Sequence, residues 1–502
     1  MSHLPILPIL LPMFVGAVLL LIARSNMALK RSLSLLATLA QVPLAWLLIS
    51  ASGEGIQVYA LGNWMPPFGI VLVLDRLSAL LLMVTAVLAS GAVLYSVRGD
   101  DIMGRNFHAL FQFQLMGING AFLTGDLFNL FVFFEILLIA SYALLLHGAG
   151  SARVRAGLHY VLLNLLGSAL FLIAVGTLYG VLGTLNMADL AVRVAALAPE
   201  EAPLVGAAGL LLLVVFGLKA AAFPLYFWLP RAYSASSAPV AALFAIMTKV
   251  GIYSIIRVYT LIFGDGVGPL ADMAQPWLWP LALLTLALGA IGALAASTLN
   301  GLVSYLVVVS VGTLLAGVAL GSEDALVATL YYLIHSTWIS GALFLFAGML
   351  ARARGPRYAG RLVSGPTVTH VQLWGGLFFV AAISVSGMPP LSGFVGKLLL
   401  LQAAGLGQQA LWLYPVVLLG GLLTLVGLSR AGSTLFWRQT PEAASGEALD
   451  VWRLLAVLLL LAGSPLLVIA AAPLLDYLQA AAAQLLSPER YIEAVMSLGE
   501  HA

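Results

Sequence analysis

The sequence predicts an all-α polytopic membrane protein with about fourteen transmembrane helices. Two observations predict this class. Hydrophobic residues make up 62% of the 502 residues and charged residues only 8%, whereas soluble domains carry about 25% charged residues. The apolar residues are also gathered into runs of about 20, the length that a helix needs to cross the hydrocarbon core of a bilayer. An ordinary water-soluble fold is therefore excluded.

The rest of the composition excludes several kinds of site. The chain has no cysteine, which rules out disulfides, iron–sulfur clusters and thiolate zinc sites. The formal net charge of +2 and the lack of a basic arm give no indication of nucleic-acid binding. The stretch "SGFVGK" (392–397) lacks the leading glycine and the Ser or Thr of a phosphate-binding loop. We therefore predict no cofactor, no metal site and no redox activity of the chain's own.

Fourteen apolar segments define the predicted order of elements. They are 4–23, 32–51, 72–96, 106–124, 126–147, 158–182, 203–228, 238–263, 276–297, 301–320, 324–350, 371–403, 410–437 and 453–482. The first has no basic residues before it and is long enough to span, so we expect a helix rather than a cleaved signal peptide. Residues 53–71 contain Gly, Pro and β-formers, which predicts a loop outside the membrane with a hairpin. The polar tail from Ser487 is expected at the surface.

Basic residues are distributed unequally between alternate loops, and this asymmetry predicts orientation. Fifteen fall in one set of loops and at most four in the other. The first set is Arg24, Lys30, Arg31, Arg98, Arg105, Arg153, Arg155, Arg231, Arg352, Arg354, Arg357, Arg361, Arg430, Arg438 and Arg453, and the second is Arg76, Arg193, Arg257 and Arg490. Because basic loops stay in the cytoplasm, we predict that both termini are external.

Three lysines are left after this count, and all lie inside predicted spans: Lys219, Lys249 and Lys397. The chain has only four lysines against eighteen arginines. Arginine keeps its proton in a protein, whereas a lysine in apolar surroundings can release it. Among acidic residues only Glu135 lies in the middle of a span. Four such charges would cost about 10–14 kcal/mol at about 2.5–3.5 kcal/mol each, so they must face one another, water or polar backbone groups.

Each of these residues also has a purely structural interpretation. Glu135 could serve only to neutralise a lysine, and Lys397 follows the broken stretch "SGMPPLSGFVGK" (386–397), where a charge at a half-helix end is less costly. His335 lies mid-span in "LYYLIHSTWISGALF" (330–344). An imidazole suits proton relay near neutral pH, but a hydrogen-bonded histidine of the bundle is an equally good interpretation. His108 and His159, near span ends, are expected to be structural, and His147 and His370 to be interfacial.

Two predicted spans are interrupted by proline next to a lysine. Pro224 follows Lys219 in "FGLKAAAFPLYFWLP" (216–230), and Pro389 and Pro390 precede Lys397. Proline breaks a helix, and a broken span is tolerated only where its backbone is buried in protein or lines a hydrated cavity. The two broken spans are the seventh and the twelfth, so spans 4–8 and 9–13 would run in opposite orientations. We therefore predict two inverted five-helix repeats, each with one broken helix at an ion site.

Four stretches resemble a known family. They are "GDLFNLFVFFEILLIASYALL" (125–145), "LKAAAFPLYFWLPRAYSASSAPVAALFAIMTKVGIYSIIRVY" (218–259), "YYLIHSTWISGALFLFAGML" (331–350) and "SGMPPLSGFVGK" (386–397). They resemble the antiporter-like subunits shared by respiratory complex I and Mrp-type cation/proton antiporters, and the first is most similar to the D subunits of the Mrp group. The resemblance covers nearly all fourteen spans and implies a bundle with a proton path along the membrane midplane.

The resemblance also implies roles for individual residues. Glu135 matches the family's fifth-helix glutamate, Lys219 the lysine of the broken seventh helix and Lys249 the central lysine of the eighth. His335 matches the histidine of helix eleven, and Lys397 the ion of the broken twelfth helix. Complex I relatives often carry a lysine a few residues after that histidine, where this chain has "STWISG" (336–341). The missing lysine weakens the inference that the second half of the chain conducts protons as those relatives do, and it makes His335 more important to that inference.

The sequence therefore predicts a proton-translocating subunit of a multisubunit Na⁺/H⁺ antiporter in a bacterial cytoplasmic membrane, active with other membrane subunits. We expect an N-terminal three-helix segment at 1–105, repeats at 106–263 and 276–437, and a C-terminal helix and tail at 453–502. A proton-pumping subunit of NADH:quinone oxidoreductase is the near alternative. An organic-substrate transporter is a more distant alternative, because the sequence shows a line of single ionisable residues instead of a polar or aromatic pocket. A membrane scaffold is disfavoured, because it would not require lysine rather than other residues inside the spans.

Overall fold

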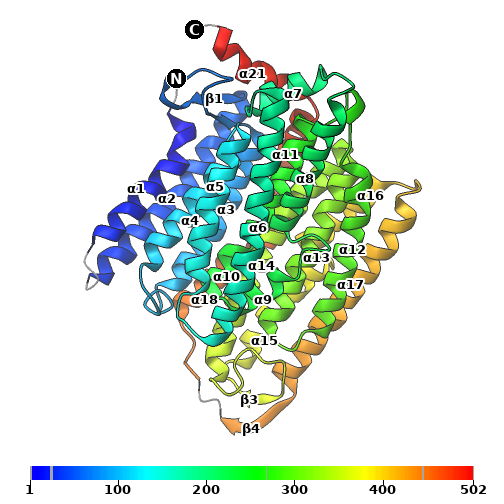
Figure 1. The fold of residues 1–502 in the computed structure, drawn as a ribbon. Coiled ribbons are helices and arrows are strands. Elements are labelled where there is room, and N and C mark those ends of the chain that lie inside the picture. Colours follow the sequence, from blue (N-terminus) through cyan, green and yellow to red (C-terminus); the bar gives the residue numbers. More distant parts are fainter. Residues whose placement is uncertain (1–2, 23–25, 267, 444–445, 501–502) are drawn as a thin grey trace.

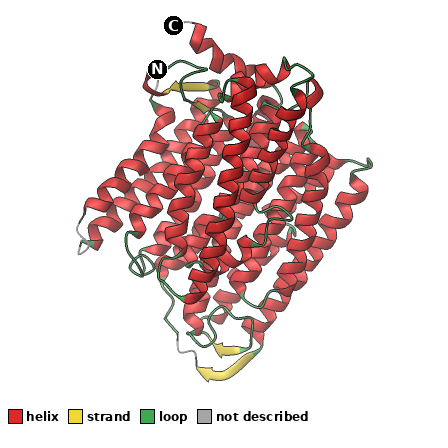
Figure 2. Cartoon of the chain, viewed as in Figure 1, coloured by secondary structure: helices red, strands yellow, loops and turns green. Residues whose placement is uncertain are grey.

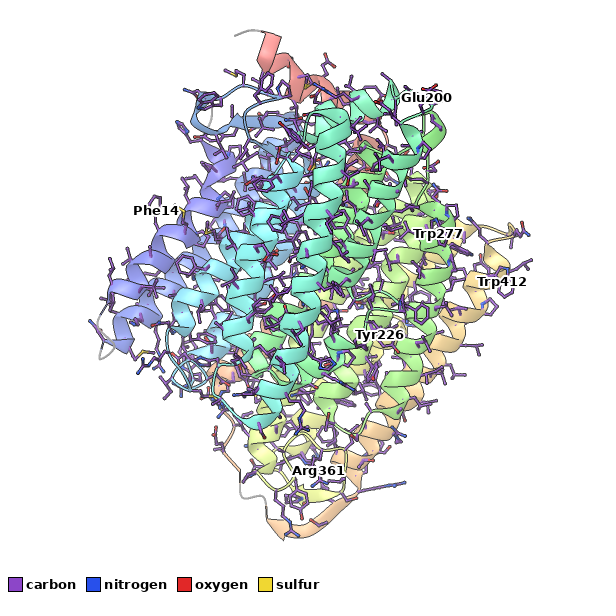
Figure 3. All side chains as sticks on the ribbon, in the orientation of Figure 1. Phe14, Glu200, Tyr226, Trp277, Arg361 and Trp412 are labelled. Atoms are coloured by element: carbon purple, nitrogen blue, oxygen red, sulfur yellow. The ribbon has the colours of Figure 1, made fainter. Side chains whose placement is uncertain are left out.

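A computed structural model describes residues 3–22, 26–266, 268–443 and 446–500. Figure 1 shows a bundle of long helices that run between two ends of the molecule, with both termini at the same end. The strands of the described residues are short and lie at these two ends (Figure 2). Phe14, Trp277 and Trp412 lie on the outer sides of the bundle (Figure 3) and are more than half exposed. The bundle thus presents apolar side chains outward, as a protein surrounded by lipid does.

The N-terminal segment contains three long helices and a hairpin. The helices are α1 (Leu7–Leu21), preceded by the 3₁₀ turn Leu4–Ile6, then α2 (Met27–Glu54) and α3 (Arg76–Ser96). Strands β1 (Gln57–Ala60) and β2 (Val71–Leu74) pair antiparallel. The hairpin was expected, but the third predicted span begins too early. Its first residues form β2, and α3 starts only after Asp75, whose carboxylate accepts a hydrogen bond from the Ser78 amide at 2.8 Å.

The middle of the chain forms long helices interrupted at two places. The elements are α4 (Phe107–Leu123), α5 (Leu127–Leu145), α6 (Ser151–Leu182), α7 (Met187–Ala195), α8 (Ala202–Ala220), α9 (Trp228–Ala235), α10 (Ala238–Phe244) and α11 (Met247–Leu261). Helix α7 has only nine residues, and an apolar-run count cannot detect a helix this short. Asn186 caps it, because its side chain accepts hydrogen bonds from the amides of Ala188 and Asp189.

The last part of the chain repeats this pattern of long and interrupted helices. The elements are the 3₁₀ turn Gly268–Leu270, α12 (Gln275–Ala295), α13 (Leu299–Leu320), α14 (Glu323–Arg354), β3 (Gly365–Thr367), α15 (Val371–Ser386), α16 (Ser392–Ala404), α17 (Ala410–Gly432), a π-helical turn (Ser433–Trp437), β4 (Gln439–Ala443), α18 (Val451–Leu461), α19 (Gly463–Ile469), α20 (Ala471–Leu485) and α21 (Pro488–Glu500). Strands β3 and β4 pair in parallel at the end opposite the termini (Figure 1).

Twelve helical segments of the described chain are long and apolar enough to cross a membrane. Two of the fourteen predicted spans fall short of that length. The fourth corresponds to α4, which has 17 residues, and the twelfth is divided into α15 and α16. The fourteenth, predicted as one helix over 453–482, is divided among α18, α19 and α20. Pro465 and Pro473 lie in the first turns of α19 and α20, where proline is tolerated because it needs no amide hydrogen bond.

The centre of the bundle is formed by a few almost completely buried helices. Along α10–α11, α13 and α14, between 89% and 100% of the most apolar window is buried inside the molecule. Helices α1, α2, α6 and α17 lie at the outside, where only 33–39% is buried. The centre is therefore shielded from lipid by protein, and the ionisable residues of the central helices are held away from the hydrocarbon.

Candidate functional site

The five predicted site residues lie within the bundle. Lys219, Lys249, His335 and Lys397 are at most 9% exposed, and Glu135 is partly buried. Among the described residues, none of the three lysines forms an ion pair. Hydroxyl and carbonyl oxygens take the place of opposite charges around them. An ammonium in such surroundings is solvated by polar protein groups rather than neutralised.

Glu135 and Lys219 share the hydroxyl of Ser168. Glu135 lies on α5 and accepts a hydrogen bond from Ser168 Oγ of α6. Lys219, in the last turn of α8, donates to the same Ser168 Oγ and to the backbone and side-chain oxygens of Asn164, each at 3.4 Å. The Phe134 ring lies 5.8 Å from Lys219 Nζ. Glu135 and Lys219 are thus linked through a bridging serine and not by a direct ion pair among the described contacts.

The chain is interrupted after Lys219, as the sequence predicts, and backbone groups at this interruption form hydrogen bonds within the protein. Helix α8 ends at Ala220, and Ala221 adopts the left-handed conformation (φ +61°). The Phe223 amide donates to Thr285 Oγ1 at 2.8 Å, and Trp228 Nε1 donates to the Leu218 carbonyl at 3.1 Å. These partners replace the helical bonds that Pro224 prevents. The carbonyl end of α8 is also a favourable place for a cation.

Lys249 is completely buried between α11 and α13. Its Nζ donates to Ser310 Oγ of α13 at 3.1 Å. The residue lies in the first turn of α11, immediately after an interruption at Ala245 and Ile246 that separates α10 from α11. The sequence gives no sign of this interruption, because no Pro or Gly lies there. Lys249 therefore also lies beside an irregular piece of helix.

His335 is the end of a chain of serine hydroxyls. Its Nδ1 lies 2.8 Å from Ser392 Oγ, which is 2.8 Å from Ser464 Oγ, and Ser464 Oγ is 2.6 Å from Ser384 Oγ. The four residues come from α14, α16, α19 and α15. The other ring nitrogen, Nε2, is buried and has no hydrogen-bond partner among the described residues. Ser384 and Ser392 flank the break between α15 and α16.

Lys397 lies on the other side of the same break. Its Nζ donates to the carbonyl of Ser386, the last residue of α15, at 2.7 Å. It borders a cavity of about 240 Å³ whose lining also includes Gly421 of α17 and the exposed Leu418 and Leu422. Lys397 thus lies between the break and the outer surface of the bundle.

The structure brings the predicted residues together in two groups. Glu135 and Lys219 form the first group through Ser168, and His335 and Lys397 form the second at the α15–α16 break. Lys249 belongs to neither group, because the partner of its Nζ is Ser310 Oγ of α13. The described hydrogen bonds do not connect Lys249 directly to either group.

Sequence reasoning missed the polar neighbours of these residues. Ser168, Asn164, Ser310 and Ser464 each lie in an apolar helix, where a serine or asparagine usually bonds its own backbone. Ser392 had the only usable signal, because it directly follows the broken stretch "GMPPL" (387–391). The described residues contain no group of three or more His, Asp or Glu side chains placed to hold a metal ion.

A second cluster of charged residues lies outside the spans, in the loop between α3 and α4. Asp101 accepts hydrogen bonds from Arg31 at 2.6 Å and from His108 at 3.1 Å. Burial alone would raise the pKa of Asp101, but these hydrogen bonds lower it to about 2. Asp100 lies 3.0 Å from Arg352 and 3.6 Å from Arg453. The cluster ties α2, α4, α14 and α18 together at one end of the bundle.

A protein-family model and several relatives match most of this chain. Residues 124–424 match a family model described as "NADH:quinone oxidoreductase/Mrp antiporter, TM". The D subunit of a probable K(+)/H(+) antiporter of Rhizobium meliloti (strain 1021) is 44% identical, over 99% of this chain and 98% of that protein. The D subunit of a Na(+)/H(+) antiporter of Bacillus subtilis (strain 168) is 41% identical, over 99% of this chain and 100% of that protein.

Solved structures show the same architecture. A chain in the structure of the Mrp complex from Dietzia sp. DQ12-45-1b superposes with a TM-score of 0.89 at 29% identity, covering 99% of this chain and 100% of that one. A chain of respiratory complex I from Thermus thermophilus with bound NADH superposes with a TM-score of 0.77 at 27% identity, covering 96% of this chain and 99% of that one.

Proposed function

Because this chain belongs to the NADH:quinone oxidoreductase/Mrp antiporter family, as a D subunit of the Mrp antiporters, we propose that Glu135, Lys219, Lys249, His335 and Lys397 relay protons through it. The exchanged cation in this proposal is Na⁺, after the Bacillus subtilis relative, with K⁺ as the alternative that the Rhizobium meliloti relative suggests. The main support for this relay is that three buried lysines donate hydrogen bonds to polar protein oxygens and form no ion pair among the described residues.

The first step uses the group at Ser168. A hydroxyl both donates and accepts, so Ser168 can hold Glu135 while it accepts from Lys219. An ammonium buried in apolar surroundings keeps its proton only while polar or opposite charges compensate it. When a neighbouring membrane protein of the complex attracts Glu135, Lys219 loses part of that compensation and passes its proton through water toward Lys249. Glu135 is suited to this control because it is only partly buried.

The later steps run from Lys249 to His335 and Lys397. Lys249 and His335 lie on the central helices α11 and α14, which both pack against α13. Lys397 contacts the break near His335 and borders the cavity at the surface of the bundle. We place the proton exit there. A complete cycle also needs loading from one side and discharge to the other, which the partner subunits gate in this proposal.

The two broken segments support the predicted inverted repeats over 106–263 and 276–437. The first break, at 221–227, follows Lys219, and the second, at 387–391, lies between Ser386 and Lys397. Each places a lysine against carbonyl or hydroxyl oxygens. In an inverted pair of repeats, two such breaks lie near the midplane of the membrane.

We further propose that the chain works in a bacterial cytoplasmic membrane, assembled with other membrane subunits and with both termini external. The relatives' names assign them to antiporters with more than one subunit, and the matching solved chain comes from an Mrp complex. The outer surfaces of α6 and α17 carry many exposed leucines, which suits contact with lipid or with helices of partner subunits.

Replacement of Lys219 by arginine tests the relay. Arginine keeps the positive charge but does not release its proton, so Lys219→Arg in the assembled complex should lower cation/proton exchange by about 10²-fold or more. Exchange is measured in inside-out vesicles with a fluorescent pH probe after separate additions of NaCl and KCl, which also identifies the cation. A normally assembled variant with wild-type exchange would remove Lys219 from the proton path.

A further inference from the structure

The serine chain beside His335 is a hydrogen-bonded wire built from three separate helices. Ser384, Ser392 and Ser464 are 0–4% exposed, and consecutive oxygen atoms lie 2.6 and 2.8 Å apart, with 2.8 Å to His335 Nδ1. Many buried serines elsewhere in the bundle bond a carbonyl of their own helix, as Ser90 does with Ala86 at 2.7 Å. The three serines instead bond one another, so their hydroxyl groups form one continuous path.

The hydroxyl groups of this path can donate their hydrogen bonds in either of two directions. Ser464 Oγ also accepts the Ser392 amide at 3.3 Å, which leaves it one lone pair and one proton for the chain. In the first direction each hydroxyl donates toward His335, and Nδ1 accepts while Nε2 carries the ring proton. In the second direction Nδ1 carries the proton and donates to Ser392, and each hydroxyl donates toward Ser384. The two directions correspond to the two tautomers of neutral His335.

We propose that Ser384, Ser464 and Ser392 conduct protons between the α15–α16 break and His335. A proton from the Lys249 side of the relay binds His335 Nε2, and the resulting imidazolium passes its Nδ1 proton to Ser392 Oγ. Ser392 then protonates Ser464, Ser464 protonates Ser384, and Ser384 gives its proton to water at the break. One N–H bond and four O–H bonds form, while the donor's bond to its proton, one N–H bond and three O–H bonds break, so the step balances. Rotation of the hydroxyls with a change of tautomer then resets the chain.

Two features of the site fit this path. His335 Nε2 is buried without a partner among the described residues, which leaves it free to take a proton from a transient donor. Lys397 donates to Ser386, two residues after Ser384, so the path ends at the segment that also holds the terminal lysine of the relay. Ser464 comes from α19, outside the two predicted repeats. The inference rests on the proposed function, because it extends the relay through His335.

Removal of the end of the wire is the sharpest test. Ser384→Ala leaves the His335–Ser392–Ser464 bonds in place but removes the last hydroxyl before the proton exit, so a role in holding His335 would not be affected. We expect exchange by the assembled complex in inside-out vesicles to fall about 10²-fold, the lower range for a positioned proton-transfer group. Ser464→Ala should cause the same loss, and Ser464→Thr, which keeps a hydroxyl, should retain exchange within about threefold of wild type. Ser90→Ala is the matched control for loss of a buried hydroxyl.

The outcomes separate this inference from the proposed function. Wild-type exchange in Ser384→Ala, or in a properly assembled Ser464→Ala, overturns the wire. So does a Ser464→Thr variant that assembles normally but is as inactive as the alanine variant. If His335→Ala abolishes exchange while Ser384→Ala does not, the relay stands and the wire fails. If Lys219→Arg and His335→Ala both retain full exchange, the relay itself fails and the wire fails with it.

Discussion

At the scale of single residues, the interior charges are held by neutral polar groups. Lys219 has Asn164 and Ser168, Lys249 has Ser310, and Lys397 has the carbonyl of Ser386. Direct ion pairs do occur among the buried groups described, but near the ends of the bundle, as between Arg257 and Asp75 at 2.5 Å. A tight ion pair would hold a proton firmly on its lysine, whereas a hydroxyl can pass one on. This difference suits proton transfer at the three lysines.

Asp101 gives a pH-dependent prediction at this scale. Its pKa is about 2 in the folded protein, below the ordinary 3.8, so its carboxylate stabilises the fold above about pH 4 and loses this effect as the pH falls toward 2. Asp101→Asn should destabilise the protein by about 1–3 kcal/mol at neutral pH, because Arg31 and His108 lose a charged acceptor.

Thermal unfolding of the purified complex checks this. The difference in melting temperature between wild type and Asp101→Asn should be larger at pH 5 than at pH 3. Asp476→Asn, at an exposed acid without a described partner, is the control and should change stability by less than about 0.5 kcal/mol. An equal difference at both pH values would show that the Asp101 charge contributes nothing.

At the scale of elements, glycines decide how closely α12 and α13 approach. A Cβ atom on Gly312 of α13 would lie 2.3 Å from the backbone nitrogen of Leu286, and one on Gly289 of α12 would lie 2.8 Å from that of Val309. Small residues allow such close contact between membrane helices. The pair holds α12, which carries the Thr285 partner of the first break, against α13, which carries the Ser310 partner of Lys249.

Gly312→Ala should therefore destabilise the bundle. The new methyl group meets backbone rather than a movable side chain, and overpacking of this kind costs about 1–3 kcal/mol. Gly176→Ala on α6 is the matched control, because a Cβ atom there has no neighbour within 4 Å among the described residues. Thermal unfolding of both variants is compared with wild type. The packing argument is wrong if Gly312→Ala is as stable as Gly176→Ala.

At the scale of the whole molecule, charge separates the two ends of the bundle. Both termini lie at one end, and β3, β4 and the basic segment after α14 lie at the other (Figure 1). Arg257, which the sequence count assigned to an external loop, is instead buried in α11 and paired with Asp75. Its guanidinium lies 5.1 Å from the Tyr491 ring, so the pair also holds α21 against the bundle. When Arg257 is left out of the count, the difference in basic residues between the two sets of loops, which predicts the orientation, becomes larger.

Cysteine labelling tests this orientation directly, because the chain has no cysteine of its own. Glu200 and Arg361 are exposed at opposite ends of the molecule (Figure 3). A membrane-impermeant maleimide should label Glu200→Cys in intact cells and Arg361→Cys only in inside-out vesicles. The reverse pattern would place the termini in the cytoplasm and contradict the rule that basic loops remain there.

Much of this protein could be predicted from the sequence, because a bilayer imposes simple requirements on it. Runs of about 20 apolar residues mark helices, and family motifs near Glu135 and Lys219 correctly predicted the Mrp group, which the relatives and the family model confirm. The breaks near Lys219 and Lys397 were visible because proline cannot continue a helix. The five proposed relay residues stood out because a charge in an apolar span is costly, and their role remains a proposal.

Only the tertiary structure decided what surrounds those residues. The bridge of Ser168 between Glu135 and Lys219 and the wire from Ser384 to His335 join helices that are far apart in the chain. Serine is common in membrane helices and leaves no periodic signal, so its partners depend on how the helices pack. The interruption before Lys249 and the division of the last segment into α18, α19 and α20 depend on packing in the same way. Hydrophobicity along the chain determines where the helices are, and contacts between helices determine which polar groups meet.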